Sequence, residues 1–402
     1  MKDSWEMHLL GEVCGFQRGL TYKKADEVTS GGTVVLRAKN VSLDRGELDF
    51  KELRRISEKV DVPPTKRIRR DSLLIRTVSG SRSHLGKVAL IDTDKSYALG
   101  GFMGLISPGQ AVNPKFLYWL TQSAIWADHL TGVTAGANSN NLKFKDIASL
   151  PIPLPPLEEQ RRIVAVLDEA FEGLARARAN IEANLADAED VFDAFLTERL
   201  GRVEEDHAAQ PLSKLCSRIT VGHVGSMASR YVDDGVHFLR SQNIRPFRVD
   251  LTEVKFVDAA FDAELKKSRL RPGDVAIVRT GYPGTSAVIP NGLEANCADL
   301  VIATPGPDLE ADFLALFLSS SFGKAHVGSN LVGAAQKHFN VTKAKRTPLA
   351  LPPKETQMEL VKEAHAMRTQ CNEARSAYHA QLADLDALRQ SLLARAFRGE
   401  LT

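Results

Sequence analysis

The sequence predicts an α+β protein of two tandem α/β domains separated by two long antiparallel coiled-coil helices, with an approximate two-fold axis relating its halves. Three observations support this prediction: an internal repeat, a proline-rich stop after each globular stretch, and a long apolar stripe after each stop. The length of 402 residues agrees, because it exceeds what one ordinary hydrophobic core supports.

The internal repeat is visible as a constant offset between matching segments. A shift of 203 places LRAKNV (36–41) on LRSQNI (239–244) and Arg76-Thr77 on Arg279-Thr280. Beyond a glycine-rich loop the shift becomes 197, and FLYWL (116–120) then meets FLALF (313–317). An offset that changes only once indicates duplication rather than chance similarity.

Each copy begins with a globular stretch of about 150 residues. Short apolar runs at 72–78, 87–91 and 274–280 alternate with Gly, Asn and Pro, which predicts strands and loops, with a helix at 114–127. Proline-rich stops follow at 149–160 and 347–357. Because proline fixes φ and lacks an amide donor, these segments are expected to be extended, with a helix starting after each.

Two long helices are predicted from apolar residues spaced alternately by four and three positions, which is the pattern of a coiled-coil seam. The first seam runs through Ile163, Leu167, Ala170, Leu174, Ala177 and Ile181 and, after a small phase shift, through Leu185, Ala188, Phe192 and Phe195. The second runs through Leu360, Ala364, Met367, Cys371, Ala374 and Tyr378, then Leu382, Leu385 and Leu392. A helix over 157–200 would span about 66 Å. If one helix leads away and the other returns, they pair antiparallel, with one globular domain at each end.

We therefore expect four segments along the chain. They are a first globular domain at 1–155, a spacer helix at 156–203, a second globular domain at 204–353, and a second spacer helix at 354–402.

Charge is distributed unevenly, although the formal net charge is only +2. Residues 1–150 carry a net +6, residues 151–205 a net −7, residues 206–353 a net +3, and residues 354–402 are balanced. Basic globular parts joined by an acidic helical part favour binding to a polyanion at two places.

Several classes of protein are disfavoured by composition. No apolar run approaches the roughly 18 residues of a membrane helix, and the start lacks a signal pattern, so a cytoplasmic protein is expected. The four cysteines (Cys14, Cys216, Cys297 and Cys371) form no CxxC pair, which argues against zinc and against a disulfide framework.

Two stretches resemble a known family. The segment LPIPLPPLEEQRRIVAVLDEA (150–170) is similar to the start of a helical region in specificity subunits of type I restriction–modification systems, and LRQSLLARAFRGEL (388–401) is similar to the ending of that family. The second helix start, KETQMELV (354–361), departs from the pattern, although Gln357 keeps the place of Gln160.

This resemblance implies different functions for the globular domains and for the helices. Each globular domain would be a target recognition domain that reads one half of a bipartite double-stranded DNA sequence. The helices would dock two adenine methyltransferase subunits, which recruit ATP-dependent restriction subunits. The positions that mark these docking helices are Gln160, Ile163, Leu167, Gln357, Leu360, Leu392 and Phe397.

No catalytic motif, cofactor site or metal site is expected in the sequence. The only Asn-Pro, at Asn113-Pro114, is followed by Lys115 rather than by the Pro-aromatic pair of an amino-methyltransferase. GSRSHLGK (80–87) has the wrong glycine spacing and Val88 where a phosphate loop needs Ser or Thr. His84, His223 and His338 have no partners at metal-ligand spacing, so none is expected to bind metal.

Candidate contacts to the DNA backbone come from the basic segment 51–90, which holds eleven Lys and Arg against four acids. Such charge gives affinity without sequence information, although a run of this kind is also typical of a solvated face. The backbone candidates are Lys51, Arg54, Arg55, Lys66, Arg67, Arg69, Arg70 and Lys87.

Base-reading candidates lie on three loops that recur in both copies, since loops on a fixed scaffold are where specificity is tuned. They are Gln17, Arg18, Tyr22, Lys23, Arg76, Thr77, Ser79, Arg82, Ser139, Asn140, Arg279, Thr280, Tyr282, Gln336, Lys337 and His338. For Tyr22 and Tyr282, packing on their own loops is as good an interpretation as contact with bases. Asn40 and Asn243, equivalent in the LRxxN match, are expected to stabilise turns rather than to touch DNA.

Two other hypotheses remain open at this point. One is a coiled-coil interaction scaffold whose basic domains bind DNA without sequence preference. The other is a self-contained methyltransferase or nuclease, which the missing motifs disfavour.

Overall fold

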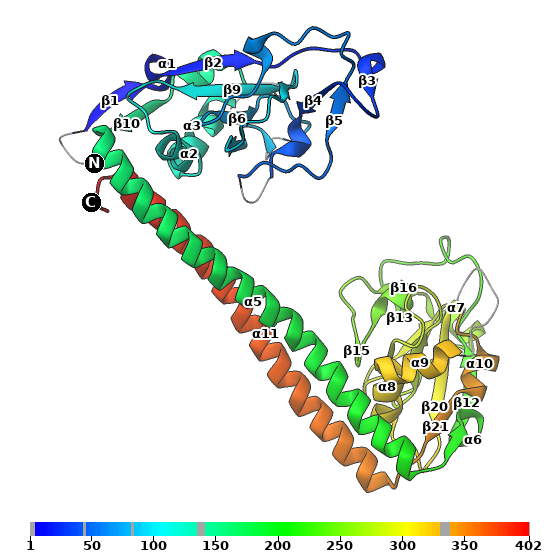
Figure 1. Cartoon of the computed structure of the whole chain (residues 1–402). Coiled ribbons are helices and arrows are strands. Elements are labelled where there is room, and N and C mark those ends of the chain that lie inside the picture. Colours follow the sequence, from blue (N-terminus) through cyan, green and yellow to red (C-terminus); the bar gives the residue numbers. More distant parts are fainter. Residues whose placement is uncertain (1–4, 43–45, 82–83, 135–140, 330–337, 402) are drawn as a thin grey trace. The chain divides into compact units, whose positions relative to one another are not determined.

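The computed structural model describes residues 5–42, 46–81, 84–134, 141–329 and 338–401 of the chain (Figure 1). Two compact units are present. Unit 1 comprises residues 1–181 and 380–402, and unit 2 comprises residues 182–379. Each unit therefore combines one globular domain with one half of each long helix. The four predicted segment boundaries stay a prediction, since the division into units passes through the helices rather than between them.

The described part of unit 1 is built from short strands, a few helices and short 3-10 helices. In order these are β1 (Glu6–Leu9), α1 (Leu10–Val13), β2 (Cys14–Arg18), η1 (Lys24–Asp26), β3 (Glu27–Val28), β4 (Thr33–Leu36), η2 (Ala38–Asn40), β5 (Arg54–Ile56), η3 (Pro64–Lys66), β6 (Leu73–Arg76), β7 (Val88–Leu90), β8 (Ala98–Leu99), β9 (Met103–Pro108), α2 (Pro114–Thr121), α3 (Ala124–Thr134), α4 (Phe144–Ala148) and β10 (Pro151–Leu154).

Two four-stranded sheets form the body of unit 1, in the orders β2-β9-β6-β7 and β3-β5-β4-β8. Side chains alternate across the first sheet, because successive residues of a strand point to opposite faces. Leu73 and Ile75 pack into a core with helix α2, whereas Leu74 packs into a second core with Leu36 and Leu99 of the other sheet. Strand β1 pairs with β10, so the start of the domain lies beside its end.

Unit 2 repeats this plan. Its elements are β11 (Ala209–Pro211), α6 (Leu212–Leu215), β12 (Cys216–Val221), β13 (Val236–Leu239), η5 (Ser241–Asn243), β14 (Ile244–Arg245), β15 (Arg248–Val249), β16 (Lys255–Val257), α7 (Ala259–Glu264), β17 (Val275–Val278), β18 (Ser286–Val288), β19 (Ala295–Cys297), β20 (Leu300–Pro305), α8 (Ala311–Ser319), α9 (Ser321–Ser329), α10 (Val341–Arg346) and β21 (Pro348–Ala350).

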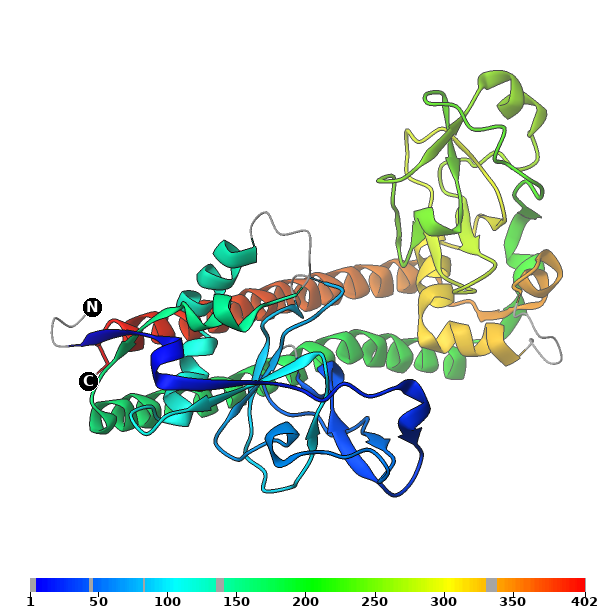
Figure 2. The same ribbon diagram turned by 90° about the horizontal axis from the view of Figure 1, so that it is seen from above.

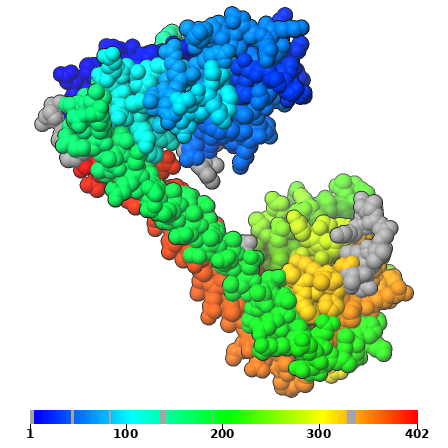
Figure 3. Space-filling view, viewed as in Figure 1, coloured from blue at the N-terminus to red at the C-terminus, as the bar shows by residue number. Residues whose placement is uncertain are grey.

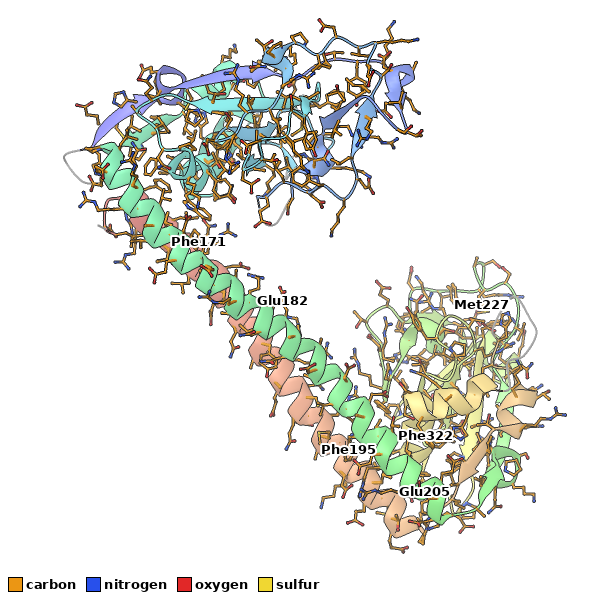
Figure 4. The ribbon with its side chains drawn as sticks, in the orientation of Figure 1. Phe171, Glu182, Phe195, Glu205, Met227 and Phe322 are labelled. Atoms are coloured by element: carbon orange, nitrogen blue, oxygen red, sulfur yellow. The ribbon has the colours of Figure 1, made fainter. Side chains whose placement is uncertain are left out.

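The sheets of unit 2 match those of unit 1. Strand order β12-β20-β17-β18 corresponds to β2-β9-β6-β7, and β16-β13-β19 corresponds to β5-β4-β8. Helices α8 and α9 lie beside the unit 2 part of helix α5 (Figure 2). Phe322 of α9 and Phe195 of α5, both labelled in Figure 4, pack against the same core.

The predicted duplication is confirmed by the strand pairing, with one correction of register. Strands β6 and β17 pair with β9 and β20 so that Arg76 occupies the place of Val278, and Thr77 the place of Arg279. The offset at this point is therefore 202, not 203. The match of Arg76-Thr77 with Arg279-Thr280 was wrong by one residue, because an Arg-Thr pair occurs one step apart in the two copies.

The helix expected at 114–127 is two helices. Helix α2 starts at Pro114, where the Asn113 side chain accepts hydrogen bonds from the amides of Lys115 and Phe116 at 2.9 and 3.1 Å. It ends at Thr121, and α3 starts at Ala124.

The two long helices are α5 (Leu157–Asp206) and α11 (Lys354–Phe397). Seam residues such as Leu174 and Leu382 are half-buried, whereas neighbours such as Arg176 and Ala383 are exposed, as a two-helix coiled coil requires. Within unit 1 Arg178 pairs with Asp386, and within unit 2 Arg199 pairs with Glu363, so the helices run antiparallel in both units. Figure 3 shows the start of α5, in green, packed against the globular part of unit 1.

Candidate nucleic-acid interface

In unit 1 the candidate base readers gather at the edge of the first sheet, where β2 and β6 end and β9 begins. Gln17 pairs in register with Leu105, and Arg76 with Met103, so both side chains lie on the same face with β9 between them. Gln17 Nε2 and Arg76 Nε are buried without a hydrogen-bond partner among the described residues. Burial lowers the pKa of the Arg76 guanidinium. Because buried donors are normally satisfied, unpaired donors at one edge suggest a missing acceptor.

The same pattern recurs in unit 2. Thr220 stands in the place of Gln17, and its hydroxyl is likewise buried and unpaired within the described part of the chain. Arg37 and Arg240, which are equivalent, both have a buried Nε atom without a partner there. Neither arginine was among the predicted site residues. The sequence signal that could have identified them is their identity in both copies of LRxxN.

The turn beside these arginines is fixed by buried asparagines, as predicted. The amides of Arg37 and Arg240 donate to Asn40 Oδ1 and Asn243 Oδ1 at 2.9 and 3.1 Å. The side-chain amide of each asparagine donates to the backbone of the following loop, and both residues are almost fully buried. They are therefore structural residues.

A cleft of about 530 Å³ opens at this edge in unit 1, lined by Tyr22, Arg37 and Phe102 among others. The Phe102 ring is 68% exposed, while its carbonyl accepts hydrogen bonds from the amide and hydroxyl of Thr77, both at 3.1 Å. Tyr22 is half-buried and donates to Glu27 at 3.4 Å. Burial and the Glu27 carboxylate raise the pKa of Tyr22. Tyr22 therefore packs on its own loop, and Phe102 presents its aromatic surface to solvent.

At the same edge of unit 2 an ion pair takes the place of these apolar groups. Arg279 Nη1 donates to Asp299 Oδ1 at 2.6 Å, and Thr280 Oγ1 lies 3.4 Å from Asp299 Oδ2. Tyr282, on the following loop, is 82% exposed. Tyr282 is thus accessible for stacking, unlike Tyr22. Phe102 and Asp299 were not predicted, and no sequence pattern distinguishes them.

The remaining base-reading candidates differ in accessibility. Thr77 and Ser79 are each only 7% exposed; the Thr77 hydroxyl donates to the Phe102 carbonyl, and the Ser79 hydroxyl accepts from the Ser81 amide at 3.2 Å. Both are buried in the chain as described, and their role as base readers stays a prediction. Arg18 is exposed and lies 5.5 Å from the Phe144 ring centre.

Lys23 is exposed at the start of η1, and His338 is half-buried. The other candidates, Arg82, Ser139, Asn140, Gln336 and Lys337, lie outside the described residues.

The backbone candidates also divide into groups. Lys66 and Arg67 donate to the carbonyls of Arg18 and Ser96 at 2.8 and 3.0 Å, so both stabilise the fold. Arg54 pairs with Glu27 at 3.5 Å, Arg55 donates to the Gly31 carbonyl at 3.3 Å, and Arg70 pairs with Asp94 at 2.6 Å. Lys51, Arg69 and Lys87 are exposed.

The positions that mark the predicted docking helices are mostly buried within the chain, and docking by these helices stays a prediction. Gln160 accepts from the Asn113 amide at 2.7 Å and donates to two carbonyls, and Gln357 accepts from the Glu310 amide at 2.8 Å in the same way. Ile163, Leu167, Leu360 and Phe397 are at most 3% exposed, and Leu392 is half-buried. These side chains attach the helices to their own globular domains.

Exposed apolar side chains on the helices are different residues. Val191 of α5 and Leu388 of α11 are 49% and 48% exposed. They are separated by the repeat offset of 197, so they occupy equivalent positions in units 2 and 1.

No metal-binding group of three or more His, Cys, Asp or Glu residues occurs among the described residues. Within the same ranges, no helix combines the length and the apolar character needed to cross a bilayer. Cys14 and Cys216 are free thiols, and burial raises the pKa of both to about 12, so they are unreactive at neutral pH.

Comparison with known proteins agrees with this architecture. The family model described as "Type I restriction modification DNA specificity domain" matches residues 2–184. The chain is 25% identical over 423 residues to the type I restriction enzyme EcoKI specificity subunit of Escherichia coli K12, covering 100% of this chain and 90% of that protein. It is 24% identical to the StySPI specificity subunit of Salmonella potsdam, with the same coverage.

Solved structures share the fold. A chain from a study titled "Structural basis underlying complex assembly and conformational transition of the type I R-M system" has a TM-score of 0.79 at 22% identity, covering 100% of this chain and 99% of that one. The HsdS subunit from Thermoanaerobacter tengcongensis has a TM-score of 0.63 at 22% identity, with coverage of 100% and 98%. These structures share the fold, while the matching family model and the full-length similarity to the curated specificity subunits assign the family: the chain belongs to the specificity subunits of type I restriction–modification systems.

Proposed function

We propose that each unit reads one half of a bipartite DNA target, and that the helices dock two adenine methyltransferase subunits. The chain then directs methylation and, through restriction subunits, cleavage, while carrying no catalytic centre itself. It acts in the cytoplasm, where its DNA target is.

The observation that carries this proposal is the recurrence of unpaired donors at equivalent places. Arg37 and Arg240 correspond by the repeat offset, and so do Gln17 and Thr220. A buried donor without a hydrogen-bond partner costs about 1–3 kcal/mol. Because both copies carry such donors at equivalent places, both are suited to a ligand of the same kind that supplies acceptors. Two similar reading edges with different neighbouring residues suit two different half-sites.

Docking of two identical partners requires two equivalent surfaces, which Val191 and Leu388 supply. A single exposed apolar side chain is normal on a protein surface, so the support comes from its recurrence at the same repeat position of both long helices. Replacing either residue with Asp should remove one methyltransferase copy, measured as stoichiometry by native mass spectrometry. Met358→Asp is the matched control, since Met358 is 58% exposed but its repeat counterpart is Arg161.

The decisive experiment is methylome sequencing of the source organism with and without this gene. The proposal expects methylated adenine at one split motif, lost entirely on deletion. Survival of methylation at every such motif would contradict it.

A domain exchange separates the two reading units. Replacing residues 1–150 with the equivalent domain of another family member should change one half of the motif and leave the other unchanged. A change in both halves would contradict independent reading. A scaffold that binds DNA without sequence preference would instead yield no motif, and the family membership does not favour it.

A further inference from the structure

The Arg279–Asp299 ion pair in unit 2 is a rigid arrangement at the proposed reading edge. Arg279 directly follows β17, and its carbonyl accepts from the Phe339 amide at 3.0 Å. The amide of Asp299 donates to the His223 carbonyl at 3.1 Å, and its φ of 53° lies in the left-handed region. Backbone hydrogen bonds therefore fix both residues before any ligand arrives.

The charge of the pair argues against contact with phosphate. A phosphate contact is favoured by an exposed, uncompensated cation, because affinity arises from counterion release. The Arg279 side chain is only 17% exposed, and Asp299, 47% exposed, neutralises it at 2.6 Å. A carboxylate in this position would also repel a phosphate. The pair is suited to directed hydrogen bonds with an uncharged group.

The free hydrogen-bonding capacity of the pair lies on the guanidinium. Both carboxylate oxygens have partners, in Arg279 Nη1 and Thr280 Oγ1. Arg279 Nε is buried and has none among the described residues, and a guanidinium offers five donors in a planar fork, of which Asp299 takes one. Guanine presents two acceptors, O6 and N7, on its major-groove edge, whereas adenine presents a donor beside its acceptor.

We propose that Arg279 is a specificity-determining residue that reads a guanine in the half-site of unit 2, and that Asp299 is its positioning residue. The proposal rests on the proposed function of the chain. In unit 1 the equivalent places hold Thr77 and the loop of Gly101 and Phe102, which carry no charge. The Arg279–Asp299 pair therefore has no counterpart in unit 1, and the guanine preference that it gives belongs to the half-site of unit 2.

The test compares methylated motifs after co-expression of each variant with the methyltransferase of its own system. The wild-type motif must contain a G·C pair in the half-site assigned to unit 2 by domain exchange. Arg279→Ala should relax that one position, with a loss of roughly 5- to 150-fold in preference, and leave the other half-site unchanged. Asp299→Asn, chosen because Asn tolerates a positive φ, should relax the same position more weakly.

The control is Arg269→Ala. Arg269 pairs with the buried Asp262 at 3.0 Å in the same unit, so its loss removes a comparable ion pair without altering the reading edge. It should lower the amount of methylation without changing the motif. The same result for Arg279→Ala, a motif unchanged at every position, would overturn the inference. So would a unit 2 half-site without G·C.

Failure of the proposed function has a different signature. In that case the wild-type complex itself gives no split motif. A wild-type split motif that Arg279→Ala leaves intact overturns only the guanine assignment. If Asp299→Asn tightens DNA binding but keeps the full guanine preference, Asp299 serves only to repel phosphate, and its positioning role is overturned.

Discussion

Units 1 and 2 share a backbone scaffold but differ in the side chains that they bury where strands β6 and β17 begin. In unit 2 Arg218 and Asp274 form an ion pair at 2.5 Å, with Asp274 fully buried. The equivalent positions in unit 1 are Gly15 and Ser72, and the Ser72 hydroxyl lies 3.3 Å from that of Ser107. The same strand geometry thus accommodates either a charged pair or small uncharged residues at these positions. The scaffold constrains backbone pairing more than side-chain chemistry.

Other positions do not vary between the units. Gln160 and Gln357 make equivalent sets of three hydrogen bonds, and Asn40 and Asn243 both fix the turn after the equivalent strands β4 and β13. These residues satisfy backbone groups that no other element reaches. The comparison therefore separates residues required by the shared fold from residues free to specify a target.

The largest expected effect tests whether each unit is stabilised by its own helix ends. Phe397 is 1% exposed, and its ring centre lies 5.3 Å from that of Phe116. Phe397→Ala should destabilise unit 1 by about 3–5 kcal/mol through lost burial and a cavity. Hydrogen exchange followed by mass spectrometry should show faster exchange in unit 1 only. Leu200→Ala, at the equivalent position, should speed exchange only in unit 2. Faster exchange in the other unit for either variant would contradict the assignment of each helix end to its own unit.

Next in size is the ion pair of unit 2. Arg218→Ala leaves the Asp274 carboxylate buried without its cation, which should cost about 2–4 kcal/mol in the free energy of unfolding. The double variant Arg218→Gly with Asp274→Ser, which installs the residues of unit 1, should recover most of this loss. Urea denaturation measures both. A double variant no more stable than Arg218→Ala would show that the two scaffolds are not interchangeable.

A smaller effect is expected for the buried glutamines. Gln160→Ala and Gln357→Ala each leave one amide and two carbonyls without partners, at a cost of about 1–3 kcal/mol. The two costs, measured by local hydrogen exchange, should agree within about 0.5 kcal/mol because the geometry is repeated. Unequal costs would mean that the second helix start, which departs from the family pattern, has changed its role.

The smallest effect is a pH dependence confined to unit 2. Burial lowers the pKa of His326, but hydrogen bonds to the Phe322 carbonyl and to Glu204, together with the Glu204 charge, outweigh it, so the net pKa is raised. Stability from this charge is therefore present below about pH 6.5 and is lost as pH rises through the folded-state pKa. The effect should be below about 1 kcal/mol. His326→Asn should remove it. The repeat counterpart, His129, contacts a carbonyl at 2.6 Å instead of a carboxylate.

The fold was largely predictable, because periodicity and repeat offset are properties of the sequence itself. The two long helices and strands β6, β7 and β17 lie where the apolar patterns predict them. Two details were not predictable. The apolar stripe of a coiled coil looks the same where it packs on the other long helix and where it packs on a domain, so the stripe does not show that Leu167 lies in the core of unit 1. Arg-Thr pairs occur at 76–77 and 279–280, and their chance match concealed that the two strands are aligned one residue differently.

The candidate site was less predictable. Tyr22 and Tyr282 occupy similar loops in the sequence, yet one binds Glu27 and the other is 82% exposed. That difference follows from loop conformation, which residue types do not specify. Asp299 gained its role only through the place of its backbone beside Arg279.

The composition of unit 1 has a consequence for how the protein is made. The core of unit 1 includes Leu393, Ala396 and Phe397, which are synthesised long after residue 181. At about 5–20 residues per second the ribosome needs roughly 11–43 s to cover that distance. The core of unit 1 is therefore completed only after unit 2 has been synthesised. Until then the apolar side chains of unit 1 that pack against α11 stay exposed to solvent on the nascent chain. Chaperone binding during synthesis should therefore concentrate on the first half of the chain.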